Sequence, residues 1–519
     1  MIPQEPFAVE PWSVTEEHLE LDRLAQSESV FALSNGHIGL RGNLDEGEPF
    51  GLPGTYLGGY YETRPLPYAE AGYGYPEDGQ TIVNVTNGKL IRLLVDDEPF
   101  DVRYGKVLSH VRRLDLRAGV LERVVRWRSP AGRDVEIRST RLVSFVQRSV
   151  AAIRYEVRPL DGETRLVVQS ELVANEPGPR LSDDPRAAAA LARPLVPEAC
   201  EDHGARAVLV HRTRASGLRM AAGMDHLVDG PDGTVVDVES HPDLARVTVA
   251  TEVGHGASLV VTKLLAYGWS RRRSLPAVRD QVDAALSSAV RTGWDGLVRE
   301  QRAYLDRFWA GADIEIDGDT ELQQAIRFAL FHSLQCGARA ERRAIAAKGL
   351  TGSGYDGHAF WDSETYVLPL LTYTVPHAAA DALRWRHATL PLARERAATL
   401  GLRGAAFPWR TIHGEECSAY WPAGTAAFHV SADIADAVIR YVDATGDAEF
   451  EREVGLELLV ETARLWRSLG HHDVDGAFHI DGVTGPDEYS ALADDNVYTN
   501  LMAQRNLLGA VDAAARWPR

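Results

Sequence analysis

The spacing of apolar residues changes once along the chain, at about Ser270. Before this point, from about Glu20 to Tyr267, short runs of alternating apolar and polar residues follow one another between turn residues. A period of two is typical of β-strands that are buried on one face. Because no helical pattern separates these runs, they predict a large antiparallel β-sandwich over residues 1–269.

Two segments of this first half have the composition of hairpins. Residues 81–100 contain two β-rich runs around Asn87-Gly88, a pair suited to a tight type I′ turn. A second pair of runs, on either side of residues 130–132, repeats the pattern. Residues 31–47, FALSNGHIGLRGNLDEG, have the Gly-rich composition of an ordered loop that shapes a surface, although ordinary turns would explain it too.

After Ser270 apolar residues recur at steps of three and four, which predicts helices. Residues 270–318 are expected to form a linker of two helices, and residues 319–519 a helical domain. Polar, aromatic loops separate the helical patterns, at a helix–loop–helix spacing of roughly 35 to 50 residues that is typical of an (α/α) toroid. The five predicted helices cover residues 321–335, 376–401, 431–447, 450–470 and 496–517.

Composition argues against several kinds of partner and site. The chain has 55 basic and 74 acidic residues, a net charge of −19, which disfavours nucleic acid or an anionic membrane surface. Cys200, Cys336 and Cys417 are too few and too scattered for a disulfide framework or a zinc site, so no metal is expected. The N-terminal residues lack an export signal, and no apolar run approaches about 18 residues. These features predict a cytoplasmic protein.

Residues 471–500 combine acids, histidines, tyrosines and asparagines with almost no apolar run, a composition that suits a polar pocket. Within them, Gly485-Pro486 forces a turn, so Asp487 and Glu488 lie on a rigid loop or in the first turn of a helix. One of the two adjacent carboxylates at most can face a substrate. An ordinary helix start explains the same residues, because the N-terminal dipole favours carboxylates. The spacing alone leaves both interpretations open.

Several motifs resemble those of glycoside hydrolase family 65, the inverting disaccharide phosphorylases that act on maltose, trehalose, kojibiose and related α-glucosides. In chain order they are FALSNGHIGLRGN, GHAFWDSETYVLP, WPAGTAAFH, DGVTGPDEYS and DDNVYTNLMAQRNL. The resemblance implies an N-terminal β-sandwich, a linker of helices, an (α/α)6 barrel and a small C-terminal β domain.

The resemblance also implies that the chain is truncated at its C-terminus. Residues 319–519 would then form the first part of an incomplete (α/α)6 catalytic barrel, without the C-terminal β domain. Apolar stripes on the helices at 320–337 and 497–516 would face solvent at the open edge. The phosphate-binding residues of the family are expected beyond Arg519, so the chain does not reveal which nucleophile is used or whether it is active alone.

The family motifs assign roles to individual residues. Glu488 matches the general acid, and Trp361 and Asp362 match the pair that holds the non-reducing glucose, although the residues alone would favour a core position for Trp361. The Glu415-Glu416 pair is either solvated or within reach of the leaving sugar. The further substrate-binding candidates are Tyr355, His358, Trp409, Glu415 and His429.

The implied chemistry fits these residue types. Inverting cleavage needs an acid that protonates the leaving oxygen and a base that activates water. Phosphate arrives as an anion, so one protein carboxylate suffices, and Glu488 must be protonated when the substrate is bound. The ring of Trp361 would stack on an apolar sugar face while Asp362 accepts hydrogen bonds from hydroxyl groups.

The expected function is inverting phosphorolysis of an α-linked glucose disaccharide to β-glucose 1-phosphate and a sugar. No cofactor is expected; the partners are the disaccharide and inorganic phosphate, and the oligomeric state stays open, with a homodimer as one option. The alternatives are an inverting α-glucoside or trehalose hydrolase of the same fold, and an inactive fragment or non-catalytic sugar-binding protein. Arg410 stands where family phosphorylases commonly have an acid, so the leaving sugar cannot be taken from the family.

Overall fold

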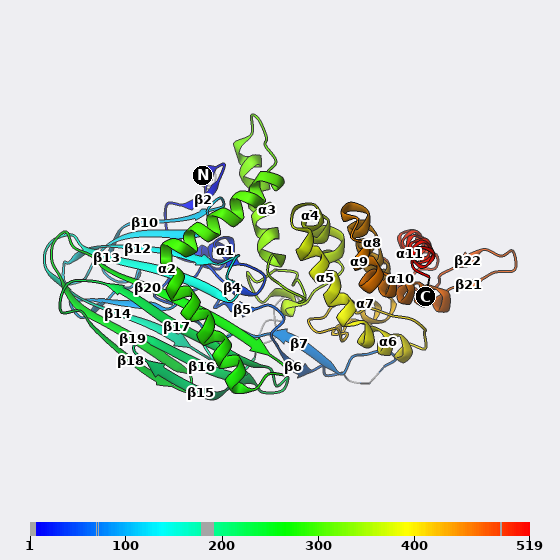
Figure 1. Cartoon of the computed structure of the whole chain (residues 1–519), viewed down its shortest axis with the longest axis horizontal. Coiled ribbons are helices and arrows are strands. Elements are labelled where there is room, and N and C mark those ends of the chain that lie inside the picture. Colours follow the sequence, from blue (N-terminus) through cyan, green and yellow to red (C-terminus); the bar gives the residue numbers. More distant parts are fainter. Residues whose placement is uncertain (1–6, 69, 71, 178–190, 488–489, 519) are drawn as a thin grey trace.

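The computed structural model describes residues 7–68, 70, 72–177, 191–487 and 490–518. The strands gather at one end of an elongated molecule and most helices at the other (Figure 1). The strands of the first part are β1 (Ala8–Glu10), β2 (Ser13–Glu16), β3 (Leu33–Ser34), β4 (Ile38–Leu40), β5 (Thr55–Leu57), β6 (Tyr61–Pro65), β7 (Asp78–Ile82), β8 (Ile91–Val95), β9 (Glu98–Pro99), β10 (Lys106–Asp115), β11 (Val120–Arg128), β12 (Asp134–Val143), β13 (Val150–Pro159), β14 (Thr164–Val173), β15 (Leu195–His203), β16 (Arg206–Thr213), β17 (Arg219–Asp229), β18 (Val235–His241), β19 (Leu244–Val253) and β20 (Leu259–Ser270).

Two antiparallel sheets form the predicted β-sandwich, which is confirmed. The larger sheet has the order β1-β2-β10-β11-β12-β13-β20-β17-β16-β15, and the smaller has the order β18-β19-β14-β8-β9. Side chains alternate between buried and less buried along strands such as β19, as the period of two predicted. Trp127, Tyr155 and Val249 are among the buried residues that fill the core.

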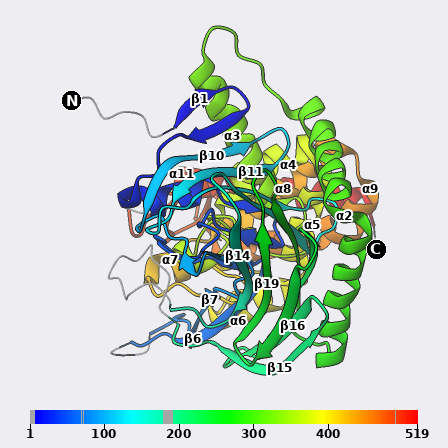
Figure 2. The ribbon, with the colours of Figure 1, turned by 90° about the vertical axis from the view of Figure 1, so that its left-hand side faces the viewer.

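Strand β20 is buried along nearly its whole length because both of its faces are covered. Val261 and Leu265 belong to the main core, whereas Leu264 and Ala266 pack with residues of α2 (Leu275–Ala312). Figure 2 shows α2 running along one side of the sandwich. The sequence predicted two helices here, and α2 consists of two helical segments that meet at a kink at Gly293, whose φ is 65°.

The hairpin predicted around Asn87-Gly88 is wrong. Strand β7 pairs with β6, whereas β8 pairs with β14 and β9. Asn87 instead forms an isolated bridge with Val173, and a Cβ on Gly88 would collide with the hydroxyl of Tyr267. The tight turn lies at Asp96-Asp97, whose positive φ values of 48° and 69° have the sign that a type I′ turn requires. The second predicted hairpin is confirmed by the pairing of β11 with β12.

Residues 31–47 form a buried connection and not the surface loop that their composition indicated. They contain β3 and β4, and nearly every residue of the segment is buried. The amide of Asn35 donates to Ser144 O in the sandwich at 2.7 Å, and Asn35 O accepts from Arg339 N at 2.7 Å. A Cβ on Gly39 would collide with Leu350. Glycine is therefore used here to let the two parts of the chain approach closely.

The second part is helical and lies beyond β20. Besides the short α1 (Leu24–Val30) in the first part, the helices are α3 (Thr320–Gly337), α4 (Leu368–Thr374), α5 (Pro376–Ala388), α6 (Leu390–Thr399), α7 (Trp421–Ala426), α8 (His429–Thr445), α9 (Ala448–Phe450), α10 (Leu456–Leu469) and α11 (Val497–Arg516), with the small strands β21 (His471–His472) and β22 (Phe478–His479) before α11. The single helix predicted over 376–401 is wrong, because Pro391 lacks the N–H that a helix interior needs and starts a new helix.

The exposure of apolar side chains differs between α3 and α11. On α11 the side chains of Val497, Leu501 and Leu508 are exposed, as the sequence predicted for 497–516. On α3 the prediction is wrong, because Phe331 and Leu334 are fully buried and part of the main core. In the described ranges, no helix combines the length and the apolar character that crossing a bilayer would require.

The loop after α6 provides a test of the packing between α6 and α10. Gly401 and Gly404 both have positive φ values, of 69° and 81°, but only at Gly404 would a Cβ collide with backbone atoms of α10. Gly404→Ala is therefore expected to lower the free energy of unfolding by about 2–6 kcal/mol, the sum of backbone strain and overpacking. Gly401→Ala, the matched control, should lose only about 1 kcal/mol. Equal losses in denaturant titrations would contradict this interpretation.

Candidate functional site

A cavity of about 550 Å³ opens between the loops that precede α4 and α7. Its volume lies within the range of about 300–1,000 Å³ that is usual for small-ligand sites. Four of the residues predicted from the sequence line it, namely Tyr355, Trp361, Asp362 and Trp409. The other lining residues are Ala347, Lys348, Phe360, Arg410, Ser418, Tyr420 and Ala423.

Trp361 and Asp362 stand at the start of the helical segment that leads into α4. A π-helical turn over Ser363–Val367 follows them, and Trp361 O accepts a hydrogen bond from Thr365 N at 3.0 Å. The indole of Trp361 is half-buried, whereas Asp362 is exposed and its carboxylate caps no backbone N–H of the turn. The carboxylate is therefore available to a ligand in the cavity.

The backbone at Tyr355 and Asp356 is held in a strained conformation. Their φ values are 56° and 57°, in the left-handed region that ordinary residues avoid at a cost of about 1–3 kcal/mol each. Arg410 stabilises this arrangement: its Nη2 donates to Tyr355 O at 3.0 Å and lies 3.3 Å from the carboxylate of Asp356. Arg410 thus lines the cavity and also fixes a neighbouring part of its wall.

His358 is buried behind this wall, whereas Glu415 is exposed and lies outside the cavity lining. The Nε2 of His358 is 2.5 Å from Gln80 O, and its Nδ1 accepts from Arg410 Nε at 2.6 Å. Burial, and then the charge of Arg410, lower the pKa of His358 well below its usual value, so its imidazole is neutral. Glu415 accepts a hydrogen bond from Gln80 Nε2 at 2.7 Å. Neither side chain is among the residues that line the cavity.

Glu416 organises the loop that carries Trp409. Its buried carboxylate accepts hydrogen bonds from the backbone N–H groups of Trp409, Cys417 and Ser418, at 2.6, 2.9 and 2.8 Å. Burial raises the pKa of Glu416 despite these bonds. The two members of the Glu415-Glu416 pair therefore bind protein groups, and Glu416 shapes the loop from inside.

His429 is enclosed by aromatic rings next to the cavity. It lies at edge-to-face angles to Trp361, Trp409 and Tyr498, with ring centroids 5.1–5.7 Å apart. Its Nδ1 is 2.7 Å from a carboxylate oxygen of Asp433, one helical turn later on α8, and Tyr498 donates to the other oxygen at 2.8 Å. Asp433 and Tyr498 were not predicted from the sequence. The available signal was the i,i+4 spacing of His429 and Asp433, which places both on one face of a helix.

Glu488, the predicted general acid, lies outside the described residues. The segments on either side of it are described: Val483 forms an isolated bridge with Ala493, and Thr484 N donates to Ala426 O, in α7, at 3.0 Å. No group of three or more His, Cys, Asp or Glu side chains in the described ranges is arranged to hold a metal ion.

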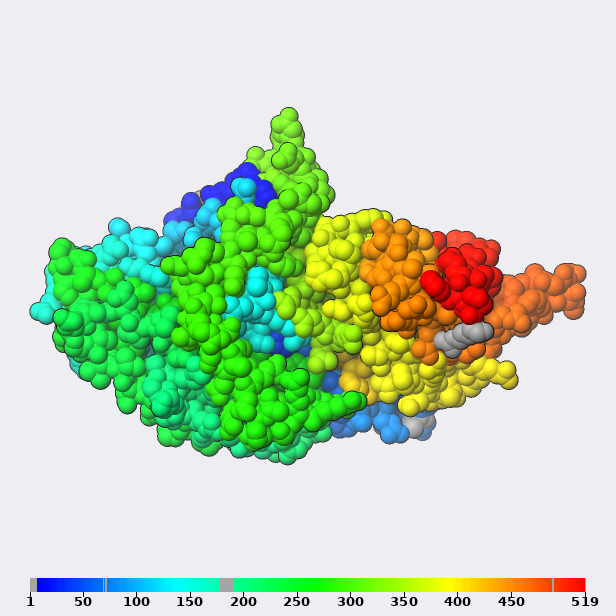
Figure 3. Space-filling view, viewed as in Figure 1, coloured from blue at the N-terminus to red at the C-terminus, as the bar shows by residue number. Residues whose placement is uncertain are grey.

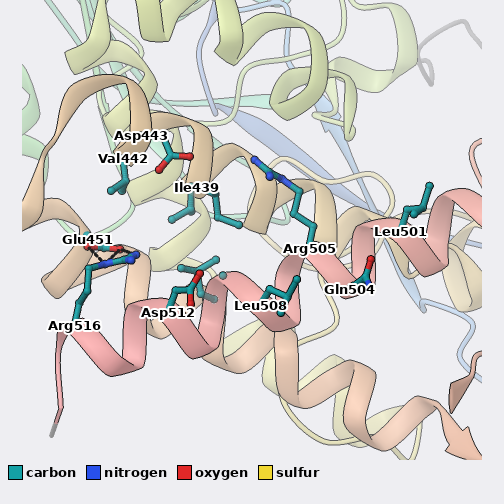
Figure 4. A pocket seen from close by; sticks show the side chains of 13 residues that line it. Ile439, Val442, Asp443, Glu451, Leu501, Gln504, Arg505, Leu508, Asp512 and Arg516 are labelled. Carbon is teal, nitrogen blue, oxygen red and sulfur yellow. Dashed lines mark hydrogen bonds and ion pairs between the residues drawn. The ribbon is translucent and has the colours of Figure 1, made fainter. Parts of the chain in front are cut away.

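Another cavity, of about 410 Å³, runs along α11 at its contact with α8. Figure 4 shows that aliphatic side chains such as Val442 and Leu508 line it and that Arg516 pairs with Glu451. Arg505 is likewise paired, with Asp436 of α8. None of its described lining residues is aromatic. The cavity beside Trp361 is therefore the better candidate for sugar recognition.

Comparison with known proteins identifies relatives over almost the whole chain. An uncharacterized glycosyl hydrolase of Mycobacterium tuberculosis is 64% identical over 518 residues, and an α,α-trehalose phosphorylase of Thermoanaerobacter brockii is 39% identical over 515 residues. They match 100% and 98% of this chain, which spans 66% of the length of each relative. A solved structure described as a putative kojibiose phosphorylase from human microbiome superposes with a TM-score of 0.90 at 27% identity, over 99% of this chain and 67% of that one.

Family descriptions match the two parts of the chain separately. Residues 14–308 match the N-terminal domain of glycosyl hydrolase family 65, and residues 327–519 match the central catalytic domain of the same family. The first match contains most of the sandwich and most of α2, and the second contains the loops that line the 550 Å³ cavity. The chain therefore belongs to glycosyl hydrolase family 65.

Proposed function

We propose that the protein cleaves an α-linked glucose disaccharide by inverting phosphorolysis, which yields β-glucose 1-phosphate and a free sugar. The observation that supports this proposal most directly is the convergence of two indole rings, Trp361 and Trp409, with the exposed carboxylate of Asp362 in one cavity. Aromatic rings bury the apolar faces of a sugar, and a carboxylate accepts hydrogen bonds from its hydroxyl groups.

In this proposal Glu488 protonates the leaving oxygen, and phosphate attacks the anomeric carbon from the opposite face. The bond from the anomeric carbon to the leaving oxygen breaks, and the bond to a phosphate oxygen forms with inversion. Asp362 binds hydroxyl groups of the transferred glucose. Phosphate is a co-substrate, and no further cofactor is needed for this step.

α,α-Trehalose is the disaccharide that we propose as substrate. The trehalose phosphorylase of Thermoanaerobacter brockii is 39% identical to this chain, compared with 27% for the putative kojibiose phosphorylase of known structure. The higher identity favours trehalose as the first disaccharide to test.

The test is to incubate the protein, in its natural full length, with trehalose, kojibiose or maltose, with and without inorganic phosphate. We expect phosphate-dependent formation of β-glucose 1-phosphate, with the highest kcat/KM for trehalose. Release of free glucose at the same rate without phosphate would identify a hydrolase instead. If the protein neither cleaves these disaccharides nor binds glucose, as followed by tryptophan fluorescence, the proposed function is wrong.

The Tyr498 hydroxyl provides a finer test of the site. Tyr498→Phe keeps the ring beside Trp361 and His429 but removes the hydrogen bond to Asp433. We expect the Kd for glucose to rise about tenfold, equivalent to about 1.4 kcal/mol, because the Asp433 carboxylate that orients His429 loses a partner. The matched control is Tyr441→Phe, which removes a similar bond from Tyr441 of α8 to Asp447, just before α9. Equal changes in Kd would show that the effect is not specific to the site.

A further inference from the structure

The sandwich part of the chain extends a two-stranded ribbon, β6–β7, to the loops around the candidate site. Figure 1 shows this ribbon reaching from the strands toward α6 and α7, and in the space-filling view its surface meets that of the helical part (Figure 3). Thr81 Oγ1 donates to Asp356 at 3.1 Å, and Arg64 Nη2 lies 3.4 Å from the same carboxylate. Thr81 and Arg64 of the ribbon therefore both bind Asp356, which belongs to the strained segment beside Arg410.

Gln80 makes the most complete set of contacts from the ribbon. It is buried, and its Oε1 accepts hydrogen bonds from the backbone N–H groups of Ile412 and His413, at 2.9 Å each. Its Nε2 donates to Glu415 Oε2 at 2.7 Å. A side chain of the sandwich part thus holds three positions, 412, 413 and 415, of the loop that begins at Trp409.

The backbone of Gln80 acts on Arg410 through His358. Because Gln80 O can only accept, His358 must carry its proton on Nε2, which leaves Nδ1 as an acceptor for Arg410 Nε. This arrangement fixes the tautomer of His358 and the plane of the Arg410 guanidinium. Arg410 in turn lines the cavity and holds the backbone of Tyr355.

We propose that Gln80 is a positioning residue of the candidate active site: it sets the loop at 409–416 and, through His358, the guanidinium of Arg410. The sandwich part therefore supplies a functional element of the site, although it supplies none of the described residues that line the cavity. The expected change in kcat/KM rests on the proposed function. The expected change in the structure of the loop can be measured separately, without any activity.

The kinetic test exchanges the two groups of the Gln80–Glu415 contact. Gln80→Glu keeps the acceptor oxygens for Ile412 and His413 but places a second carboxylate against Glu415, so kcat/KM for disaccharide phosphorolysis is expected to fall at least about tenfold. The double variant Gln80→Glu/Glu415→Gln restores a donor opposite an acceptor and should recover to within about threefold of the parent protein. A purely structural weakening would not be reversed by exchanging the groups.

The matched control is Gln147→Glu. Gln147 Nε2 also donates to a glutamate, Glu300 Oε2 at 3.1 Å, but at the contact between the sandwich and α2. This variant creates the same kind of carboxylate contact and should leave kcat/KM unchanged. Loss of activity in both Gln80→Glu and Gln147→Glu, or failure of the double variant to recover, would overturn the positioning role.

Amide hydrogen exchange tests the structural consequence without any activity. In Gln80→Ala the N–H groups of Ile412 and His413 lose their acceptor, so their exchange should accelerate at least about tenfold while that of core strands such as β13 is unchanged. If the parent protein shows no disaccharide cleavage, the proposed function fails but this measurement still tests Gln80. Unchanged exchange at Ile412 and His413 would overturn the inference itself.

Discussion

Glu488→Gln is expected to lower kcat for phosphorolysis of an unactivated disaccharide by about 10²–10⁴-fold, the usual contribution of a general acid. The amide keeps the size of the side chain but has no proton to give to the leaving oxygen. Sugar binding should change little, because the loss arises in the transition state and not in the ground state. The measurement is steady-state kinetics in parallel with glucose binding followed by tryptophan fluorescence.

A substrate that needs no protonation provides the control for this variant. Glucosyl fluoride has a leaving group that departs as an anion, so Glu488→Gln should retain most of the parent activity on it. Asp487→Asn, which alters the adjacent carboxylate, should have a much smaller effect on the disaccharide. Near-parental turnover of the disaccharide by Glu488→Gln would remove this residue from the acid role.

Arg386→Met is expected to lower the free energy of unfolding by about 3–5 kcal/mol, because it leaves the buried carboxylate of Glu364 without its partner. Both side chains are almost completely buried, and the guanidinium donates two hydrogen bonds to the carboxylate, at 2.7 and 3.0 Å. Glu364 lies in the π-helical turn that follows Asp362. The substitution should therefore also weaken sugar binding, as measured on the fraction that remains folded.

The double variant Glu364→Gln/Arg386→Met separates a lost ion pair from lost packing. It removes the unpaired charge, so most of the stability lost in Arg386→Met should return in urea titrations. Arg394→Met, which removes a half-exposed cation from its pairs with Glu457 and Glu461, is the surface comparison and should lose about 1 kcal/mol or less. A similar loss in all three proteins would contradict the special role of the buried pair.

Local patterns in the sequence predicted the architecture, a sandwich followed by helices, but not which strands pair with one another. The change of period at about Ser270 lies at the end of β20, and such a change can be read locally because periodicity depends only on which faces of an element are buried. The turn at Asn87-Gly88 was predicted wrongly, because its glycine is required by the approach of Tyr267 and not by a hairpin. The order of strands in the two sheets could not be derived, since it depends on pairings between residues far apart in the chain.

The same distinction holds for the candidate site. The sequence by itself predicted the loops that line the cavity through the family motifs around Trp361 and Trp409, whereas the residue types alone favoured a core position for Trp361. Only the tertiary structure placed His358 and Glu415 outside the cavity lining and brought Gln80 to the loop. The Gln80 amide oxygen accepts from the N–H of Ile412, which is 332 positions away in the chain. Such a contact leaves no periodic pattern in either segment. The hydrogen-bond partner of a buried polar group depends on which segment the fold packs against it.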